Sequence, residues 1–133
     1  MNSQRVMVVD DDPDILKLVA LLLQRIGVQA TTFANGRSAI HHLAQETPDL
    51  IILDLMLPDV DGLDILRQIR ARTRFDAVPV LVLSAKADPD TIRTALDGGA
   101  DSYVTKLYLT NSLLDRVRLL LTQGRRSRSL FGH

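Results

Sequence analysis

The sequence predicts one α/β domain, a doubly wound parallel sheet covered by helices on both faces. Short apolar segments alternate along the chain with longer segments whose apolar residues recur at helical spacing. Two of the short segments, RVMVV at 5–9 and LIIL at 50–53, contain continuous apolar runs (VMVV and LIIL), typical of strands buried on both faces. The chain contains five short strand-like segments that alternate with five helices through short connections. This alternation indicates a parallel sheet with right-handed crossovers.

The strands differ in character in a way that suggests their places in the sheet. The segment 28–33 alternates weakly between apolar and polar residues, which favours an edge strand, whereas the fourth strand runs directly into Ser84 and the fifth ends at Lys106. The five expected strands are residues 5–9, 28–33, 50–53, 78–83 and 102–105.

The helices are recognised by their end signals as well as by their periodicity. Asp12-Pro13 and Asp88-Pro89 each combine an N-cap residue with proline at the first helical position, and Thr110 is expected to cap the last helix. Glycines end several of these segments. The five expected helices are residues 13–26, 37–46, 62–72, 89–97 and 111–123.

Composition and length exclude several classes of function. We expect one domain over 1–123 and a basic, Ser-rich tail or truncated linker over 124–133. The chain has no cysteine, so it can form neither a disulfide nor a thiolate site. No apolar stretch approaches the roughly 18 residues of a membrane span, and no signal peptide is apparent, so a cytoplasmic protein is expected. A net charge of zero argues against direct nucleic-acid binding.

Two strand ends carry carboxylates that ordinary capping does not fully explain. Asp54 follows the buried strand in LIILDLMLPDVDG (50–62), at the carboxyl end where open α/β sheets bind their ligands. It could instead be a loop-capping residue. The first strand runs into Asp10, Asp11 and Asp12, whose adjacent carboxylates repel one another. Helix capping explains Asp12. It does not explain Asp10 and Asp11, for which a bound cation is the typical reason.

Polar residues at four strand ends form one chemical set. Three carboxylates make a hard oxygen site suited to Mg²⁺. A hydroxyl and an ammonium group can hold the oxygens of a phosphoryl group, and the carboxylate between them is the natural nucleophile for an acyl phosphate. The members of this set are Asp10, Asp11, Asp54, Ser84 and Lys106.

Four segments of the chain resemble the receiver domain of two-component response regulators. They are VMVVDDDPDI, LIILDLMLPDVDG, VPVLVLSA and GADSYVTK, and the resemblance extends over residues 5–122. It implies a flavodoxin-like strand order 2-1-3-4-5. It also implies a Mg²⁺-dependent phosphoacceptor that receives a phosphoryl group from a sensor histidine kinase or phosphotransfer protein. Such a domain signals through the surface of its fourth helix, fifth strand and fifth helix, and catalyses only its own phosphorylation and dephosphorylation.

The resemblance assigns roles to individual residues. By this comparison Asp54 is the phosphoacceptor, Asp10 and Asp11 are the metal-binding acidic pair, Met56 ligates the metal through its backbone carbonyl, Ser84 is the switch hydroxyl, Lys106 contacts the phosphoryl group, and Tyr103 changes rotamer on activation.

Two further positions bear on activation and geometry. Asp101 and Arg116 fall where family members with DNA-binding output domains carry complementary charges across a two-fold dimer, which implies a homodimer on activation. Leu107 replaces the family's usual proline after the lysine. A cis bond before a non-proline residue costs about 2.5–4 kcal/mol, so we expect a trans Lys106–Leu107 bond and a less tightly held ammonium.

Two other functions compete with the phosphoacceptor switch. A haloacid-dehalogenase-type phosphotransferase also uses an aspartate nucleophile, but there the nucleophile ends the first strand and a second aspartate lies two residues later. Here Asp54 ends the third strand and Met56 holds that second position. The other alternative is a phosphorylation-independent pseudo-receiver, a protein-binding module, which the unusual Leu107 leaves open.

Overall fold

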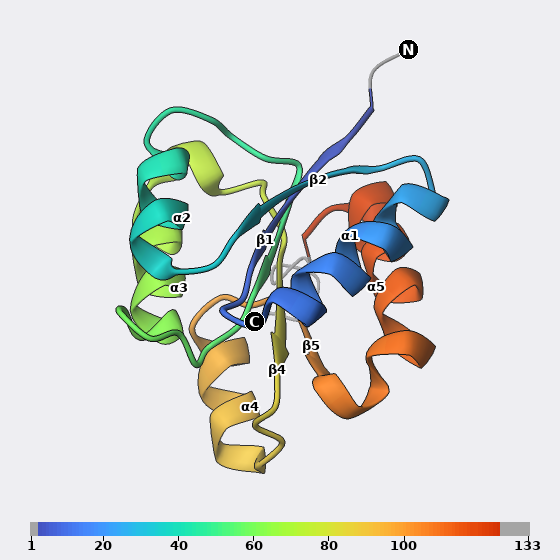
Figure 1. Ribbon diagram of the computed structural model, residues 1–133. Coiled ribbons are helices and arrows are strands. Elements are labelled where there is room, and N and C mark those ends of the chain that lie inside the picture. The colour runs from blue at the N-terminus through green and yellow to red at the C-terminus, as the bar shows by residue number, and fades with distance from the viewer. Residues whose placement is uncertain (1–2, 126–133) are drawn as a thin grey trace.

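The computed structural model describes residues 3–125 and contains one sheet of five parallel strands. Its order, β2-β1-β3-β4-β5, confirms the expected topology (Figure 1). Backbone pairing is in register along the whole of β1, from Arg5 opposite Gln29 to Val9 opposite Phe33. The strands are β1 (Arg5–Val9), β2 (Gln29–Phe33), β3 (Leu50–Leu53), β4 (Val80–Ser84) and β5 (Ser102–Thr105).

Helices cover both faces of the sheet. In Figure 1, α1 and α5 lie on one side and α2, α3 and α4 on the other. Within residues 3–125, none of the helices combines the length and the apolar character needed to cross a bilayer. The helices are α1 (Pro13–Arg25), α2 (Gly36–Leu43), α3 (Gly62–Arg70), α4 (Pro89–Asp97) and α5 (Leu109–Gln123), with short 3-10 helices at Thr73–Phe75 and Lys106–Tyr108.

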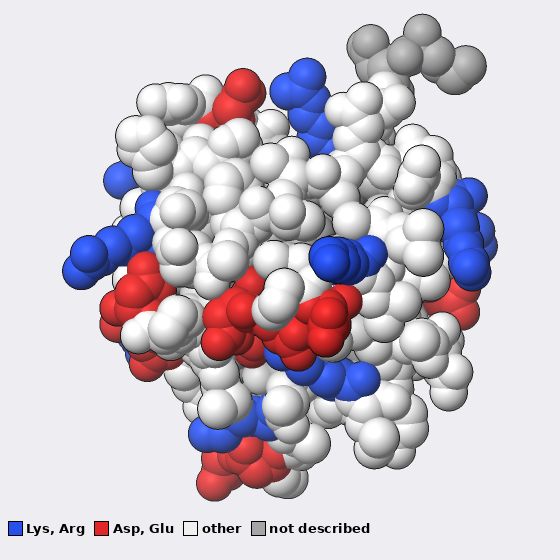
Figure 2. Space-filling model, viewed as in Figure 1, with Lys and Arg blue, Asp and Glu red and all other residues white. Residues whose placement is uncertain are grey.

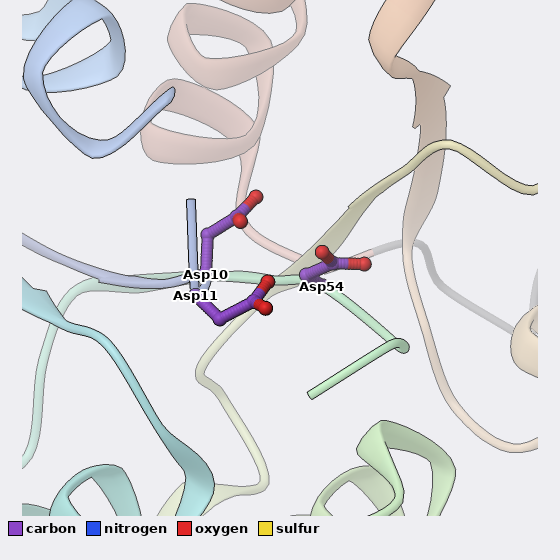
Figure 3. A group of neighbouring side chains, drawn as sticks. All are labelled: Asp10, Asp11 and Asp54. Atoms are coloured by element: carbon purple, nitrogen blue, oxygen red, sulfur yellow. The ribbon is translucent and has the colours of Figure 1, made fainter. Parts of the chain in front are cut away.

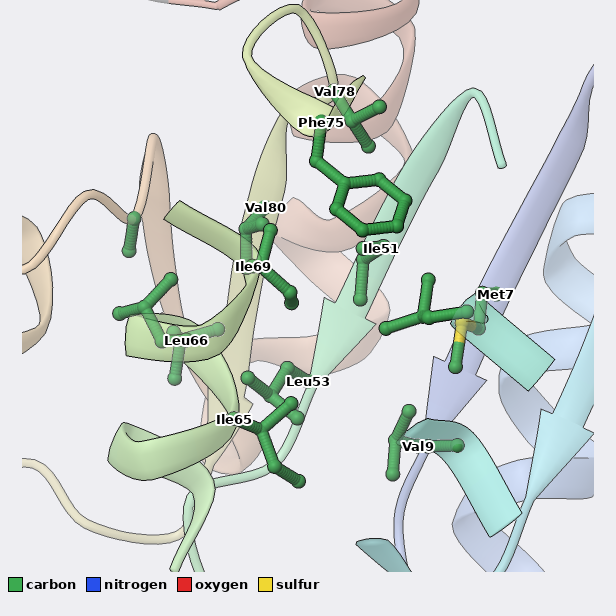
Figure 4. Close-up of a cluster of buried hydrophobic side chains, with 14 of the residues drawn as sticks. Met7, Val9, Ile51, Leu53, Ile65, Leu66, Ile69, Phe75, Val78 and Val80 are labelled. Atoms are coloured by element: carbon green, nitrogen blue, oxygen red, sulfur yellow. The ribbon is translucent and has the colours of Figure 1, made fainter. Parts of the chain in front are cut away.

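The central strands divide their apolar side chains between two cores. Met7 and Val9 pack towards α2 and α3 with Ile51 and Leu53, as Figure 4 shows. The intervening residues of β1 and β3 pack on the opposite face against α1 and α5. Both faces of these strands are therefore dry, which is the physical reason for their uninterrupted apolar sequence.

Most helix starts agree with the predicted caps. The carboxylate of Asp12 accepts a hydrogen bond from the N–H of Asp14 (2.9 Å), and that of Asp88 accepts one from Thr91 (3.0 Å). The prediction that Thr110 caps the last helix is wrong. The 3-10 helix Lys106–Tyr108 leads directly into α5, which begins at Leu109, so Thr110 already lies in the first turn.

Several element boundaries differ from the predicted ones. The second and third helices end earlier, at Leu43 and Arg70. The fourth strand starts at Val80, two residues later than expected, because the N–H of Val78 bonds to the carbonyl of Phe75 in the preceding turn. The residue between them, Pro79, has no N–H to donate to the sheet.

Candidate functional site

The carboxyl ends of β1 and β3 bring three carboxylates together. Asp10, Asp11 and Asp54 each offer an oxygen within 4.8 Å of the others (Figure 3). The backbone fixes two of them by continuing the sheet pairing, since the N–H of Asp54 donates to the carbonyl of Val9 (2.9 Å) and that of Asp10 to Phe33 (3.0 Å). Asp10 and Asp54 are buried, and Asp11 is exposed.

Lys106 reaches this cluster from the end of β5. Its Nζ lies 2.8 Å from Oδ2 of Asp10 and donates a hydrogen bond to Oδ2 of Asp54 at 3.0 Å. Residues 3–125 contain no cis peptide bond, so the bond from Lys106 to Leu107 is trans, as expected. The accompanying expectation of a loosely held ammonium finds no support in these distances, because the lysine contacts both carboxylates.

Burial and charge shift the pKa values of Asp10 and Lys106. Burial raises the pKa of Asp10, while the ammonium of Lys106 and the N–H of Asp12 act in the opposite direction without cancelling it. For Lys106, burial lowers the pKa, but its contacts with Asp10 and Asp54 outweigh burial and leave the pKa raised. The lysine therefore stays protonated at neutral pH.

The same groups fit a divalent cation. One ammonium does not balance three carboxylates, and the buried Oδ2 of Asp10 has the Lys106 ammonium, 2.8 Å away, as its ion-pair partner. Oxygen ligands of this kind and charge suit Mg²⁺. The donor set of Asp10, Asp11 and Asp54 is therefore compatible with a magnesium site.

The loop between β3 and α3 folds back onto Asp54. The N–H of Met56 donates to Oδ1 of Asp54 (3.1 Å), and the N–H of Gly62 donates to the carbonyl of Leu55 (3.0 Å). A Cβ at Gly62 would lie 2.4 Å from Cα of Leu55 and 2.6 Å from the carbonyl oxygen of Asp54, so only glycine fits there. The sequence placed Gly62 at the start of the third expected helix but gave no sign of this close approach.

Ser84 and Tyr103 both contact the loop that follows β4. The buried hydroxyl of Ser84 accepts a hydrogen bond from the N–H of Lys86 (3.3 Å), and the Tyr103 hydroxyl donates to the carbonyl of the same residue (2.8 Å). Burial raises the pKa of Tyr103, so its hydroxyl keeps its proton. The first residues of this loop thus connect the end of β4 with β5.

Asp101, which the resemblance placed at a dimer contact, does not lie at the protein surface. It is buried at the amino end of β5, where Oδ2 accepts hydrogen bonds from the N–H of Val80 (2.9 Å) and Nη2 of Arg70 (3.0 Å). Its Oδ1 accepts one from Nε of Arg125 (3.1 Å). Arg116 is bonded within the same chain, with Nη1 2.6 Å from Oγ of Ser102.

The surface around the site is acidic. On the face drawn in Figure 2, most Asp and Glu side chains gather in the lower half of the view. Beside the three carboxylates the surface is hollowed between the β3–α3 loop and the start of α4, with Asp11, Met56, Lys86 and Thr91 among its lining residues. Among the three carboxylates, Asp11 lines this hollow.

Known proteins share both the sequence and the fold. The chain matches the response regulator receiver domain family over residues 6–118. It is 42% identical over 124 residues to the regulatory protein VanRc of Enterococcus gallinarum, covering 93% of this chain and 52% of that protein. It is 37% identical over 121 residues to the DNA-binding response regulator MtrA of Mycolicibacterium smegmatis, covering 91% of this chain and 52% of MtrA. The chain thus spans about half the length of these curated relatives.

A solved structure agrees with the sequence match. The BeF3-activated receiver domain of DrrB superposes with a TM-score of 0.81 at 34% identity, covering 91% of this chain and 99% of that one. DrrB is described as an OmpR/PhoB homologue from Thermotoga maritima. Since the match spans most of the chain, and the strand order and acidic cluster agree with it, the chain belongs to the response regulator receiver domain family of two-component systems.

Proposed function

We propose that Asp54 accepts a phosphoryl group, in the cytoplasm, from a phosphohistidine of a sensor kinase or phosphotransfer protein. The observation that carries this proposal is a buried carboxylate held between two other carboxylates and an ammonium. In the transfer, an oxygen of Asp54 bonds to phosphorus while the P–N bond breaks, and its electron pair returns to the imidazole nitrogen. On itself the domain catalyses only this step and the later hydrolysis of the acyl phosphate, in which water takes the phosphoryl group as inorganic phosphate and Asp54 is released as a carboxylate.

Each neighbouring residue has a separate task. Asp10, Asp11, Asp54 and the backbone carbonyl of Met56 would hold Mg²⁺, which when bound neutralises charge on the incoming phosphoryl oxygens. The ammonium of Lys106, already 3.0 Å from Asp54, is placed to bind a phosphoryl oxygen. Its two present carboxylate contacts keep it pointed into the site until the phosphoryl group arrives.

The pseudo-receiver alternative makes the opposite prediction for a simple experiment. After incubation with acetyl phosphate and Mg²⁺, intact mass spectrometry should show one added phosphoryl group on the wild-type chain. A pseudo-receiver would show no mass increase. The contact of Lys106 with Asp10 and Asp54, beside the third carboxylate of Asp11, favours the phosphoacceptor.

We expect Asp11→Asn to weaken Mg²⁺ binding far more than Asp12→Asn. Asp11 offers a carboxylate oxygen to the acidic cluster, whereas the carboxylate of Asp12 is bonded to the N–H of Asp14 as a helix cap. Removing a direct ligand should reduce affinity by at least 10-fold, the lower end of the roughly 10–100-fold lost when even a supporting partner is removed. Titration calorimetry measures both; equal losses would contradict this division of roles.

Signal output is proposed to pass through Ser84 and Tyr103 to the surface formed by α4, β5 and α5. A phosphoryl oxygen on Asp54 can accept a hydrogen bond from the Ser84 hydroxyl and draw the following loop inwards. Because Tyr103 is bonded to the carbonyl of Lys86 in that loop, a shift of the loop changes the contacts of the ring. The domain must therefore have two conformations that the phosphoryl group binds unequally.

Beryllofluoride, which stands in for the phosphoryl group, should shift the ring resonances of Tyr103. The displaced β4–α4 loop would remove the hydroxyl's present acceptor and change the ring's surroundings. Selective labelling of tyrosine leaves two ring signals, and a Tyr108→Phe variant assigns the signal of Tyr103. Unchanged Tyr103 resonances at saturating beryllofluoride would rule out this route.

Two further partners are considered: a second copy of this chain and nucleic acid. The activated form is predicted to self-associate through α4, β5 and α5, which sedimentation of beryllofluoride-treated protein tests. Asp101 is excluded from that contact by its burial and its intrachain partners.

MtrA is named a DNA-binding response regulator. For this chain we propose that the receiver domain itself does not contact nucleic acid, in line with its net charge of zero.

A further inference from the structure

Asp59, at the tip of the β3–α3 loop, is bonded to the start of a distant helix. Its Oδ1 accepts a hydrogen bond from the N–H of Gly36 (2.8 Å), and its Oδ2 accepts one from Arg37 (3.0 Å). These two backbone donors lower the pKa of Asp59, so the carboxylate stays ionised. The helix also has its own cap, since Asn35 accepts the N–H of Ser38 (2.9 Å). The first turn of α2 is therefore capped twice, once from within and once by the loop.

The loop and α2 also pack without any space between them. A Cβ built at Gly36 would lie 2.9 Å from Cβ of Val60 and 3.2 Å from Oδ1 of Asp59. Distances this short require the loop to shift. Gly36 is buried by this contact, and its lack of a side chain allows the hydrogen bonds of Asp59 to form.

The other end of the loop forms part of the acidic site. Met56 donates its N–H to Asp54, and it pairs with Asp61 across an isolated antiparallel bridge. The N–H of Gly62 closes the base of the loop onto Leu55. The loop is thus attached at its base to the strand that carries Asp54, and at its tip to α2.

We infer that Asp59 is a positioning residue for the metal site, holding the loop so that the backbone of Met56 faces the carboxylates. This inference rests on the proposed function, because it concerns the same magnesium site. Without the tip attachment, the loop can pivot about its base and Met56 loses its fixed place beside Asp54. By this route α2, which contributes no side chain to the acidic cluster, supports metal binding.

Titration calorimetry with MgCl₂ on three variants tests the inference. Asp59→Ala should weaken Mg²⁺ binding by about 3- to 10-fold, less than the roughly 10–100-fold typical when a group bonded directly to a ligand is lost. Gly36→Ala pushes the same loop outwards without changing any charge, and should weaken binding similarly. Asn35→Ala removes the helix's own cap and leaves Asp59 in place, so it should bind Mg²⁺ like the wild type.

Amide hydrogen exchange in Mg²⁺-free protein gives a second, independent measurement. The N–H of Met56 should exchange faster in Asp59→Ala and Gly36→Ala than in the wild type. In Asn35→Ala its exchange rate should be unchanged. If only Asp59→Ala binds Mg²⁺ more weakly, the effect is one of charge and the inference is overturned. Wild-type affinity in Asp59→Ala would also overturn it while leaving the proposed function intact. A wild-type chain that binds no Mg²⁺ would overturn both.

Discussion

Asp54→Asn should abolish phosphorylation while leaving the fold intact. With acetyl phosphate and Mg²⁺, the variant should gain no phosphoryl mass, because an amide is a poor nucleophile and cannot form the acyl phosphate. The substitution preserves the shape of a buried side chain, and the amide oxygen can still accept the N–H of Met56. Intact mass spectrometry measures the first effect, and circular dichroism with thermal melting measures the second.

A neutralised carboxylate elsewhere provides the control for Asp54→Asn. Asp115 lies exposed on α5, and Asp115→Asn should be phosphorylated at the wild-type rate. Phosphorylation of Asp54→Asn at that same rate would show that another residue is the acceptor. Loss of the melting transition in Asp54→Asn would show instead that the carboxylate is needed for folding.

Asp101→Ala should cause the largest loss of stability among single side-chain truncations at charged residues. The change leaves two arginines and the N–H of Val80 without this buried acceptor. Removing one partner of a buried ion pair typically lowers the free energy of unfolding by about 3–5 kcal/mol. Urea unfolding followed by circular dichroism should show a correspondingly lower midpoint with an unchanged slope.

Two matched variants separate the buried charge from simple truncation. Asp101→Asn keeps an acceptor for Val80 and should be destabilised less than Asp101→Ala. Asp115→Ala truncates an exposed carboxylate and should change stability by less than about 0.5 kcal/mol. An Asp101→Ala protein as stable as Asp115→Ala would mean that the cluster around Asp101 does not stabilise the fold.

The sequence was informative wherever local pattern and sheet geometry coincide. Continuous apolar runs identified β1 and β3 because both faces of these strands are buried. In a parallel sheet all carboxyl ends lie at one edge, so residues far apart in sequence, such as Asp54 and Lys106, could be expected to meet, and the structure brings them to 3.0 Å. The predicted cap at Thr110 was wrong because a 3-10 helix leads directly into α5, which therefore begins at Leu109. A capping pattern in the sequence does not reveal such a 3-10 helix.

Contacts that depend on tertiary placement left no local signal. Asp101 meets Arg70 and Arg125, which are 31 and 24 residues away, and nothing in the spacing of these residues pairs them. Asp59 caps a helix that begins 23 residues earlier, and nothing in the sequence around Asp59 indicates this contact. The resemblance placed Asp101 at a dimer interface, but it could not show that this carboxylate is already bonded within the chain.

The acidic cluster and the buried ion pairs of Asp101 lie at opposite ends of β4. β4 has five residues, so its two ends lie about 13 Å apart at roughly 3.3 Å per residue. The acidic cluster of Asp10, Asp11 and Asp54 lies at one end and the Asp101 cluster at the other, with no shared hydrogen-bond partner among the contacts described. Free-energy changes at sites this far apart usually add. A protein engineer could therefore raise heat tolerance at the amino edge while retuning phosphotransfer kinetics at the carboxyl edge, as two independent adjustments.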